Sequence, residues 1–271
     1  MGALGGSGTG AIAEILIRSG IYMGDDLNGS NDNLIFTRLF KNPEWYMKSS
    51  SIQKKRRLVI LENYMKSNKL TLSNLIELFS ASQSNPTFHT NLGDYLRFTA
   101  KVFGKGNHTP DWGWKEPNTH IYVSEILEYF KDLKYIHVLR HGLDMAFSNN
   151  KQQLNNWGWK YNIILDGKEN DDELAIKQLD YWIESTKDVI KKTKKHENRL
   201  LLVNHSIFCQ KPKHEIDKII EFTGINVSIS RKKKLYEIPK NTGSNSRYKT
   251  KDLGIFSNQK LQFIQEMGFE I

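Results

Sequence analysis

A glycine-rich loop near the start of the chain has the composition of an anion-binding site. It alternates glycines with hydroxyl residues: Gly5, Gly6, Ser7, Gly8, Thr9 and Gly10. Because glycine lacks a Cβ atom, the backbone can turn sharply there and present its N–H groups to an anion, and the two hydroxyl groups add further donors. These residue types favour binding of a phosphoryl or sulfuryl group, whereas the simpler interpretation is a glycine turn that joins a strand to a helix.

The elements on either side of the loop support the anion-binding interpretation. A very short apolar run, residues 1–4, precedes the loop and predicts a strand. The run from Ala11 to Ser19 has apolar residues at helical spacing and ends at Gly20, a good residue to terminate a helix. The loop would therefore lie at a helix N-terminus, where backbone dipoles favour phosphate or sulfate.

A second candidate site follows the β-rich run KYIHVL, residues 134–139. Such a run is typical of a strand buried in a parallel sheet, and ligands in open α/β sheets bind beyond the carboxyl ends of strands. Arg140 stands at that end, and a helix is expected from about Leu143, with Asp144 and Ser148 one turn apart on one face. Arg140 and Ser148 could then grip a phosphate together, although Arg140 and Asp144 could simply pair.

A third segment, W-G-W-K-E-P at residues 112–117, carries a lysine beside aromatic side chains. Pro117 suits the first turn of a helix whose apolar face includes Val123 and Ile126. Lys115 therefore precedes a helix, flanked by groups that could exclude water, although lysines at such places are usually exposed and idle.

The length and composition indicate one α/β domain over residues 1–271. The hydrophobic share of 38% is enough for a core, and residues 34–103 have a helical period without a clear strand, which predicts an α-helical insertion. The formal charge of +9 suits an acidic ligand, nucleic acid or a membrane surface. Cys209 stands alone, which excludes an intrachain disulfide framework and favours a reducing compartment. No apolar run is long enough to span a membrane and no signal peptide is evident, so a cytoplasmic protein is expected.

Taken in order, these segments resemble the sulfotransferase family that uses 3′-phosphoadenylyl sulfate (PAPS), and most of all its bacterial branch. The resemblance rests on G-S-G-T-G, then W-K-E-P, then an apolar strand followed by R-x-x-x-D-x-x-x-S. It implies a three-layer P-loop NTPase-like fold with a central parallel sheet. It also implies that Gly5 to Gly10 hold the 5′-phosphosulfate and that Arg140 and Ser148 hold the 3′-phosphate.

The resemblance continues to the end of the chain. RLLLV, residues 199–203, looks like the late core strand, which His205 follows, and a helix is expected over residues 212–223 with Gly224 terminating it. The segment GSNSRY, residues 243–248, is similar to the loop that closes over the nucleotide, here about residues 240–250. Ser246 and Arg247 are therefore candidates for further 3′-phosphate or adenine contacts.

Two departures from the family pattern concern catalysis. Many members carry a Lys or Arg in or beside the loop, and here Lys115 is the nearest substitute for stabilising charge on the bridging oxygen. Four residues qualify by position as the base that takes the acceptor proton: Asp26, Asp32, His108 and Glu116. Asp32 is favoured because it follows the first helix, as the carboxylate does in sugar-modifying members.

The predicted reaction is in-line transfer of a sulfuryl group from PAPS to a hydroxyl or amine, with no metal required. A glycan is one candidate acceptor, because two W-G-W-K repeats could provide flat surface for a sugar ring. These repeats place indoles at Trp112, Trp114, Trp157 and Trp159. Tryptophans at such spacing are more often part of a core, so the acceptor class stays open.

Other functions fit parts of the sequence. Gly6, Gly8 and Ala11 satisfy G-x-G-x-x-[GA], with Asp25 or Asp26 near the distance of a ribose-binding acid, as in NAD(P)-binding Rossmann oxidoreductases. The long helical stretch that follows argues against repeated βαβ units. A kinase is disfavoured because the loop has no G-K-[ST] lysine. RNA binding would use the basic clusters 54–57 and 231–234, but neither has aromatic residues interleaved with its charges.

Overall fold

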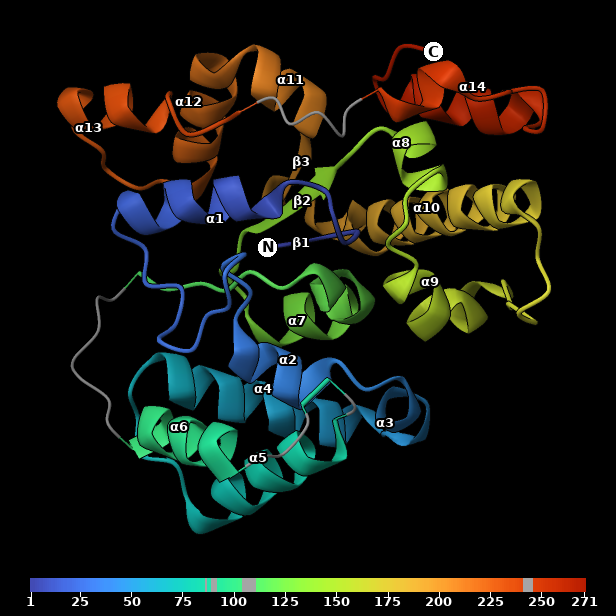
Figure 1. The fold of residues 1–271 in the computed structure, drawn as a ribbon. Helices are drawn as coiled ribbons and strands as arrows, with labels where there is room; N and C mark the ends of the chain where they lie inside the picture. The colour runs from blue at the N-terminus through green and yellow to red at the C-terminus, as the bar shows by residue number, and fades with distance from the viewer. Residues whose placement is uncertain (86, 89–91, 104–110, 241–245) are drawn as a thin grey trace. The chain divides into compact units, whose positions relative to one another are not determined.

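The computed structural model describes residues 1–85, 87–88, 92–103, 111–240 and 246–271. The described chain divides into two compact units. The first comprises Met1 and Thr9–Leu133, and the second comprises Gly2–Gly8 and Lys134–Ile271. Figure 1 shows the elements of both units in chain order.

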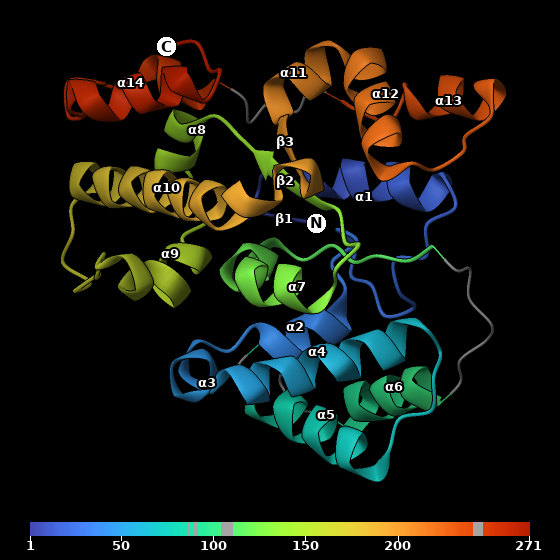
Figure 2. The ribbon, with the colours of Figure 1, turned by 180° about the vertical axis from the view of Figure 1, so that it is seen from behind.

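The second unit contains a parallel sheet of three strands in the order β1-β2-β3 (Figures 1 and 2). The strands are β1 (Gly2–Ala3), β2 (Tyr135–Leu139) and β3 (Leu200–Asn204). All five side chains of β2 are buried, as a central strand with covered faces requires. Ala3 pairs with Val138, and Leu139 pairs with Asn204, so the three carboxyl ends meet at one edge of the sheet. The strand predictions at 134–139 and 199–203 are confirmed within one residue.

Helices supply the rest of the second unit. They are α8 (Gly142–Ala146), α9 (Gln152–Trp157), α10 (Asp171–Thr193), α11 (His205–Gln210), α12 (Pro212–Thr223), α13 (Ile229–Leu235) and α14 (Asn258–Glu266), with 3₁₀ turns η2 (Gly158–Tyr161), η3 (Lys194–Arg199) and η4 (Arg247–Thr250). Helix α12 ends at Gly224 with φ of 75°, as predicted. Trp182 of α10 packs so close to α8 that a Cβ atom on Gly142 would lie 3.1 Å from its ring.

The first unit is helical over its described residues. Its elements are α1 (Thr9–Arg18), α2 (Leu34–Phe40), α3 (Pro43–Lys48), α4 (Ser51–Met65), α5 (Leu72–Ser84), α6 (Leu92–Phe103), η1 (Pro117–Tyr122) and α7 (Val123–Tyr129). Asparagine, serine and threonine caps start α2, α3, α4 and α5, which explains where these helices begin. An aromatic core joins them, with ring centroids of Phe40 and Tyr122 4.9 Å apart.

The chain therefore has the predicted α/β fold, with a central parallel sheet and a helical insertion. The elements that the structure describes between residues 34 and 103 are the helices α2 to α6. None of the described helices combines the length and apolar character needed to cross a membrane.

The basic run at residues 54–57 differs from the solvated helix face that its composition suggests. Arg57 is only 4% exposed and lies over the ring of Trp45, 3.5 Å from the centroid. Its guanidinium also pairs with Glu77 at 2.8 Å and donates to the carbonyl of Leu39. Tertiary packing of α3, α4 and α5 buries this side chain, so a basic run does not by itself mark a solvated face.

Candidate donor site and catalytic pair

The glycine loop leaves β1 at the carboxyl edge of the sheet with a backbone that glycine alone adopts readily. Gly6 and Gly8 have φ of 83° and 73°. Gln153 fixes the start of the loop, because its Oε1 accepts from the N–H of Gly5 at 2.6 Å and its Nε2 donates to the carbonyl of Ala3 at 3.3 Å. The loop therefore has a defined conformation that these hydrogen bonds and glycines maintain.

Two hydroxyl residues of the loop are buried. Ser7 is 1% exposed, and its Oγ finds no hydrogen-bond partner among the described residues. A buried hydroxyl without a partner is uncommon and suits a position that a ligand completes. Thr9 is the first residue of α1, and Gly10 follows it in the same turn. The predicted sequence of turn and helix N-terminus is present.

Arg140 follows β2 and contacts the loop. Its Nη1 donates to the carbonyl of Gly6 at 2.7 Å, and its own carbonyl accepts from Nε1 of Trp182 at 3.1 Å. Burial lowers the pKa of the guanidinium, while the negative charge of Asp144 opposes that effect. The structure therefore brings together two candidates that lie 134 residues apart.

Ser148 does not occupy the predicted place on a helix face. Helix α8 ends at Ala146, so Asp144 and Ser148 do not share a helix, and the prediction is wrong on this point. The physical reason lies in α10, where Nε2 of Gln178 donates to the carbonyls of Ala146 at 2.6 Å and Ser148 at 3.1 Å. The Oγ of Ser148 accepts from the N–H of Asn150 at 3.2 Å.

The last two nucleotide candidates, Ser246 and Arg247, lie against Asp144. The carboxylate of Asp144 accepts from the N–H of Ser246 at 3.0 Å and from the N–H of Arg247 at 2.8 Å. Burial lowers the pKa of Arg140 most, and the positive charge of Arg247 lowers it further. Of the loop predicted at about 240–250, residues 241–245 lie outside the described residues.

Sequence reasoning missed His205 as a site residue, although the same strand-end rule identifies it. His205 follows β3, and its ring packs on the loop so closely that a Cβ atom on Gly8 would lie 2.0 Å from Nε2. Burial, aided by the charge of Arg140, lowers the pKa of His205 to about 4. The imidazole is therefore neutral near pH 7, and its Nδ1 has no hydrogen-bond partner in the described part of the chain.

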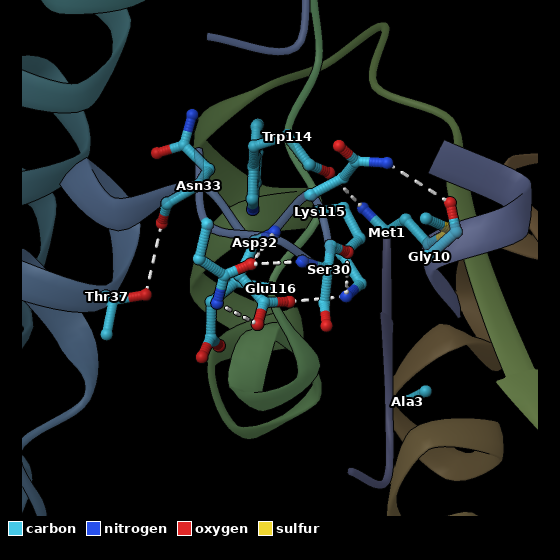
Figure 3. Close-up of polar contacts among 12 residues, drawn as sticks. Met1, Ala3, Gly10, Ser30, Asp32, Asn33, Thr37, Trp114, Lys115 and Glu116 are labelled. Atoms are coloured by element: carbon cyan, nitrogen blue, oxygen red, sulfur yellow. Dashed lines mark hydrogen bonds and ion pairs between the residues drawn. The ribbon is translucent and has the colours of Figure 1, made fainter. Parts of the chain in front are cut away.

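The two predicted catalytic residues form an ion pair in the first unit (Figure 3). Lys115 Nζ contacts Asp32 Oδ1 and donates to the carbonyl of Ser30 at 2.9 Å. The side chain of Lys115 is 3% exposed and that of Asp32 is 19% exposed. The carbonyl of Ser30 lies 3.2 Å from where a Cβ atom on Gly10 would stand. The pair is thereby close to the end of the glycine loop.

The comparisons with known proteins identify the family. The model of the sulfotransferase family matches residues 35–228, more than two thirds of the chain. The chain belongs to the sulfotransferase family. This match starts after the glycine loop of the sulfotransferase, so the loop and its contacts are independent observations. No curated protein sequence matches the chain.

Two sulfotransferase domains are among the solved structures that are similar to this chain. The sulfotransferase domain from the curacin biosynthetic pathway is 13% identical with a TM-score of 0.52, over 99% of this chain and 96% of that one. The sulfotransferase domain from the Synechococcus PCC 7002 olefin synthase is 14% identical with a TM-score of 0.48, over 99% of this chain and 94% of that one.

The other base candidates of the sulfotransferase are less accessible than Asp32. Glu116 is 2% exposed and accepts from Asn118 through both oxygens, at 2.6 and 2.8 Å. Burial raises its pKa to about 7. Asp26 is buried 3.9 Å from Arg38, and burial raises its pKa also. His108 lies outside the described residues.

Two of the four tryptophans considered for a sugar surface belong to the core of the sulfotransferase. Trp114 is 3% exposed and Trp157 is fully buried. Trp112 and Trp159 are half-buried. Within the described ranges, no three His, Cys, Asp or Glu side chains form a group that could hold a metal ion.

Proposed function

We propose that this sulfotransferase takes a sulfuryl group from PAPS and transfers it directly to a hydroxyl or amine of an acceptor. The observation that carries the proposal is the hydrogen bond between Arg140 and Gly6, which joins the ends of β1 and β2 into one anion-binding edge. In this reaction the acceptor atom forms a bond to sulfur as the bond from sulfur to the 5′-phosphate oxygen breaks. Adenosine 3′,5′-bisphosphate leaves, and the acceptor proton passes to a base.

The donor would be held by backbone and cationic groups of the second unit. The N–H groups of residues 5–8 and the unpartnered hydroxyl of Ser7 suit the 5′-phosphosulfate. Arg140 and Arg247, with Ser148 and Ser246, are assigned to the 3′-phosphate. Support for this assignment comes from the positive charge of Arg247, which adds to burial in lowering the pKa of Arg140, since a bound phosphate would offset the repulsion between the two cations.

The ion pair in the first unit supplies the groups that the chemistry needs. We assign Lys115 to the charge that develops on the bridging oxygen and Asp32 to the acceptor proton. The proposal is supported by the burial of Lys115, by the greater exposure of Asp32 and by their closeness to Gly10. Asn28 donates to the second oxygen of Asp32 at 2.8 Å, which helps to keep the carboxylate in place.

For the acceptor we propose a hydroxyl-bearing small molecule or glycan. The partial exposure of Trp112 and of Trp159 supports a sugar, whereas the buried Trp114 and Trp157 do not. The Rossmann alternative has no supporting observation, because the elements described between residues 34 and 103 are helices, where further βα units would be needed.

Calorimetric titration of the full chain tests the donor. We expect adenosine 3′,5′-bisphosphate to bind at least tenfold more tightly than 5′-AMP, NAD, ATP or an RNA oligonucleotide. Arg140→Ala should abolish that preference, whereas Lys233→Ala, at an exposed cation of α13, should leave it unchanged. Preferential binding of NAD, or an unchanged bisphosphate affinity in Arg140→Ala, would overturn the proposal.

A further inference from the structure

Asp144 is a buried carboxylate that the transfer reaction does not require. The residue is 3% exposed and lies in α8. Its two oxygens accept separate backbone N–H groups from Ser246 and Arg247, more than a hundred residues later in the chain. Burying a carboxylate is unfavourable unless hydrogen bonds and opposite charge compensate it. The two backbone hydrogen bonds compensate the burial of this carboxylate, which indicates that Asp144 holds residues 246–247 in place.

The segment that Asp144 holds is tied down at several further points. The ring of Tyr248 stacks on His141 with centroids 4.3 Å apart, and the Oη of Tyr248 donates to the carbonyl of Glu270 at 3.3 Å. Nη1 of Arg247 donates to the carbonyl of Phe147 at 3.4 Å. These contacts hold η4 against α8, so the backbone of Arg247 has a fixed position relative to that helix.

The attachment of this segment requires an unfavourable backbone conformation at Ser246. Ser246 has φ of 67°, in the left-handed region that disfavours residues other than glycine. Asp144 accepts the N–H of this residue and of the next one, and so holds the turn in that conformation. Burial lowers the pKa of Arg140, and the negative charge of Asp144 opposes that effect, so Asp144 acts on both arginines.

We propose that Asp144 is a positioning residue that sets Arg247 beside Arg140 and thereby determines selectivity for a nucleotide with a 3′-phosphate. This inference rests on the proposed function and adds to it the residue that assembles the phosphate site. Asp144 acts through the backbone of residues 246–247 and does not touch the nucleotide itself.

The test compares the affinities of adenosine 3′,5′-bisphosphate and 5′-AMP in Asp144→Ala, Asp144→Asn and Arg247→Ala. We expect the ratio of the two affinities to fall at least tenfold in Asp144→Ala and in Arg247→Ala, with little change for 5′-AMP. Asp144→Asn retains one acceptor oxygen and should fall between wild type and Asp144→Ala. The double variant Asp144→Ala/Arg247→Ala should lose no more selectivity than Arg247→Ala alone, because the two residues act as one.

Asp217→Ala is the matched control, since it removes a carboxylate that pairs with Lys232 at 2.9 Å in the same unit. A merely structural role for Asp144 would weaken both nucleotides equally. If the wild type discriminates and Asp144→Ala and Asp144→Asn keep the full ratio, the inference fails. If the wild type itself shows no preference for the bisphosphate, the proposed donor fails instead.

Discussion

The ring of His205 packs against Gly8, and this contact leaves no space for a side chain on the loop. A Cβ atom there would lie 2.0 Å from Nε2 of His205, and the φ of Gly8 is +73°. Two independent reasons, steric and conformational, therefore require glycine at this position. The contact also joins the end of β3 to the loop that leaves β1.

Replacement of Gly8 by alanine should be markedly more harmful than replacement of Gly6. Both residues have positive φ, so each alanine would add left-handed strain of about 1 to 2 kcal/mol. A Cβ atom on Gly6 meets nothing within 4 Å, whereas one on Gly8 clashes with His205 and adds about 1 to 3 kcal/mol. Urea unfolding measures the difference, and Gly6→Ala serves as the strain-only control.

The double variant Gly8→Ala/His205→Ala separates the two contributions. Removing the imidazole should relieve the clash but leave the strain, so the effect of Gly8→Ala should shrink toward that of Gly6→Ala. Equal destabilisation by the two single alanine variants would show that the ring moves away without cost.

The ion pair of Lys115 and Asp32 predicts unequal effects of removing either partner. Asp32→Asn leaves a buried ammonium with the Ser30 carbonyl, whereas Lys115→Met leaves a carboxylate that is partly exposed and still bonded to Asn28. We expect Asp32→Asn to cost about 2 kcal/mol or more and Lys115→Met to cost less. Chemical denaturation of both variants and of the double variant measures their coupling, which should exceed about 0.5 kcal/mol. Additive effects would contradict the pairing.

The same lysine should influence the rate of transfer more than binding of the nucleotide product. Loss of a group that stabilises charge only in the transition state typically lowers the rate about 10² to 10³-fold. We expect a fall of that size in PAPS turnover for Lys115→Met, with the dissociation constant of adenosine 3′,5′-bisphosphate within threefold of wild type. A similar loss in both quantities would assign Lys115 to donor binding instead.

Two neighbouring arginines in α4 should differ in how much they contribute to stability. Arg57 is buried against Trp45 and Glu77, whereas Arg56 is exposed. Arg57→Ala should destabilise the protein by about 3 kcal/mol, because it leaves the Leu39 carbonyl and Glu77 without their cation. Arg56→Ala should stay within about 0.5 kcal/mol of wild type. Comparable midpoints of urea unfolding for the two variants would show that Arg57 contributes no more than a surface charge.

Local pattern was enough to predict the strands and the turn residues that position the donor site. The apolar run of residues 134–139 identified β2 and placed Arg140 at its end, and Gly224 marked the end of α12. The same rule applied to residues 199–203 identifies His205, which directly follows a strand of the parallel sheet.

Residues whose environment is set by distant partners could not be predicted in this way. The end of α8 before Ser148 depends on Gln178, thirty positions later, and the burial of Arg57 depends on Trp45 and Glu77. The pairing of Lys115 with Asp32 spans 83 positions, so no local period reveals it. Tertiary contacts determine the environments of these residues, and such contacts cannot be inferred from helix propensity or residue spacing.

Glu116 predicts a pH dependence of stability with a definite sign. Burial raises its pKa from 4.5 to about 7, so between these values the folded state holds a proton that the unfolded state has released. The contribution of Glu116 to the free energy of unfolding should therefore be highest below pH 4.5 and fall by roughly 3 kcal/mol as the pH rises to 7.

Two glutamine variants test this prediction. Glu116→Gln cannot ionise, so its stability relative to wild type should increase across that window. Glu128→Gln, at an exposed position of α7, should show a constant difference from wild type. Taking the difference between variant and wild type removes the opposite contribution of His205, whose lowered pKa makes stability rise with pH between about 4 and 6.5. Denaturation series from pH 4 to 8 provide the measurement, and parallel curves for Glu116→Gln and wild type would mean that Glu116 ionises as an ordinary exposed glutamate does.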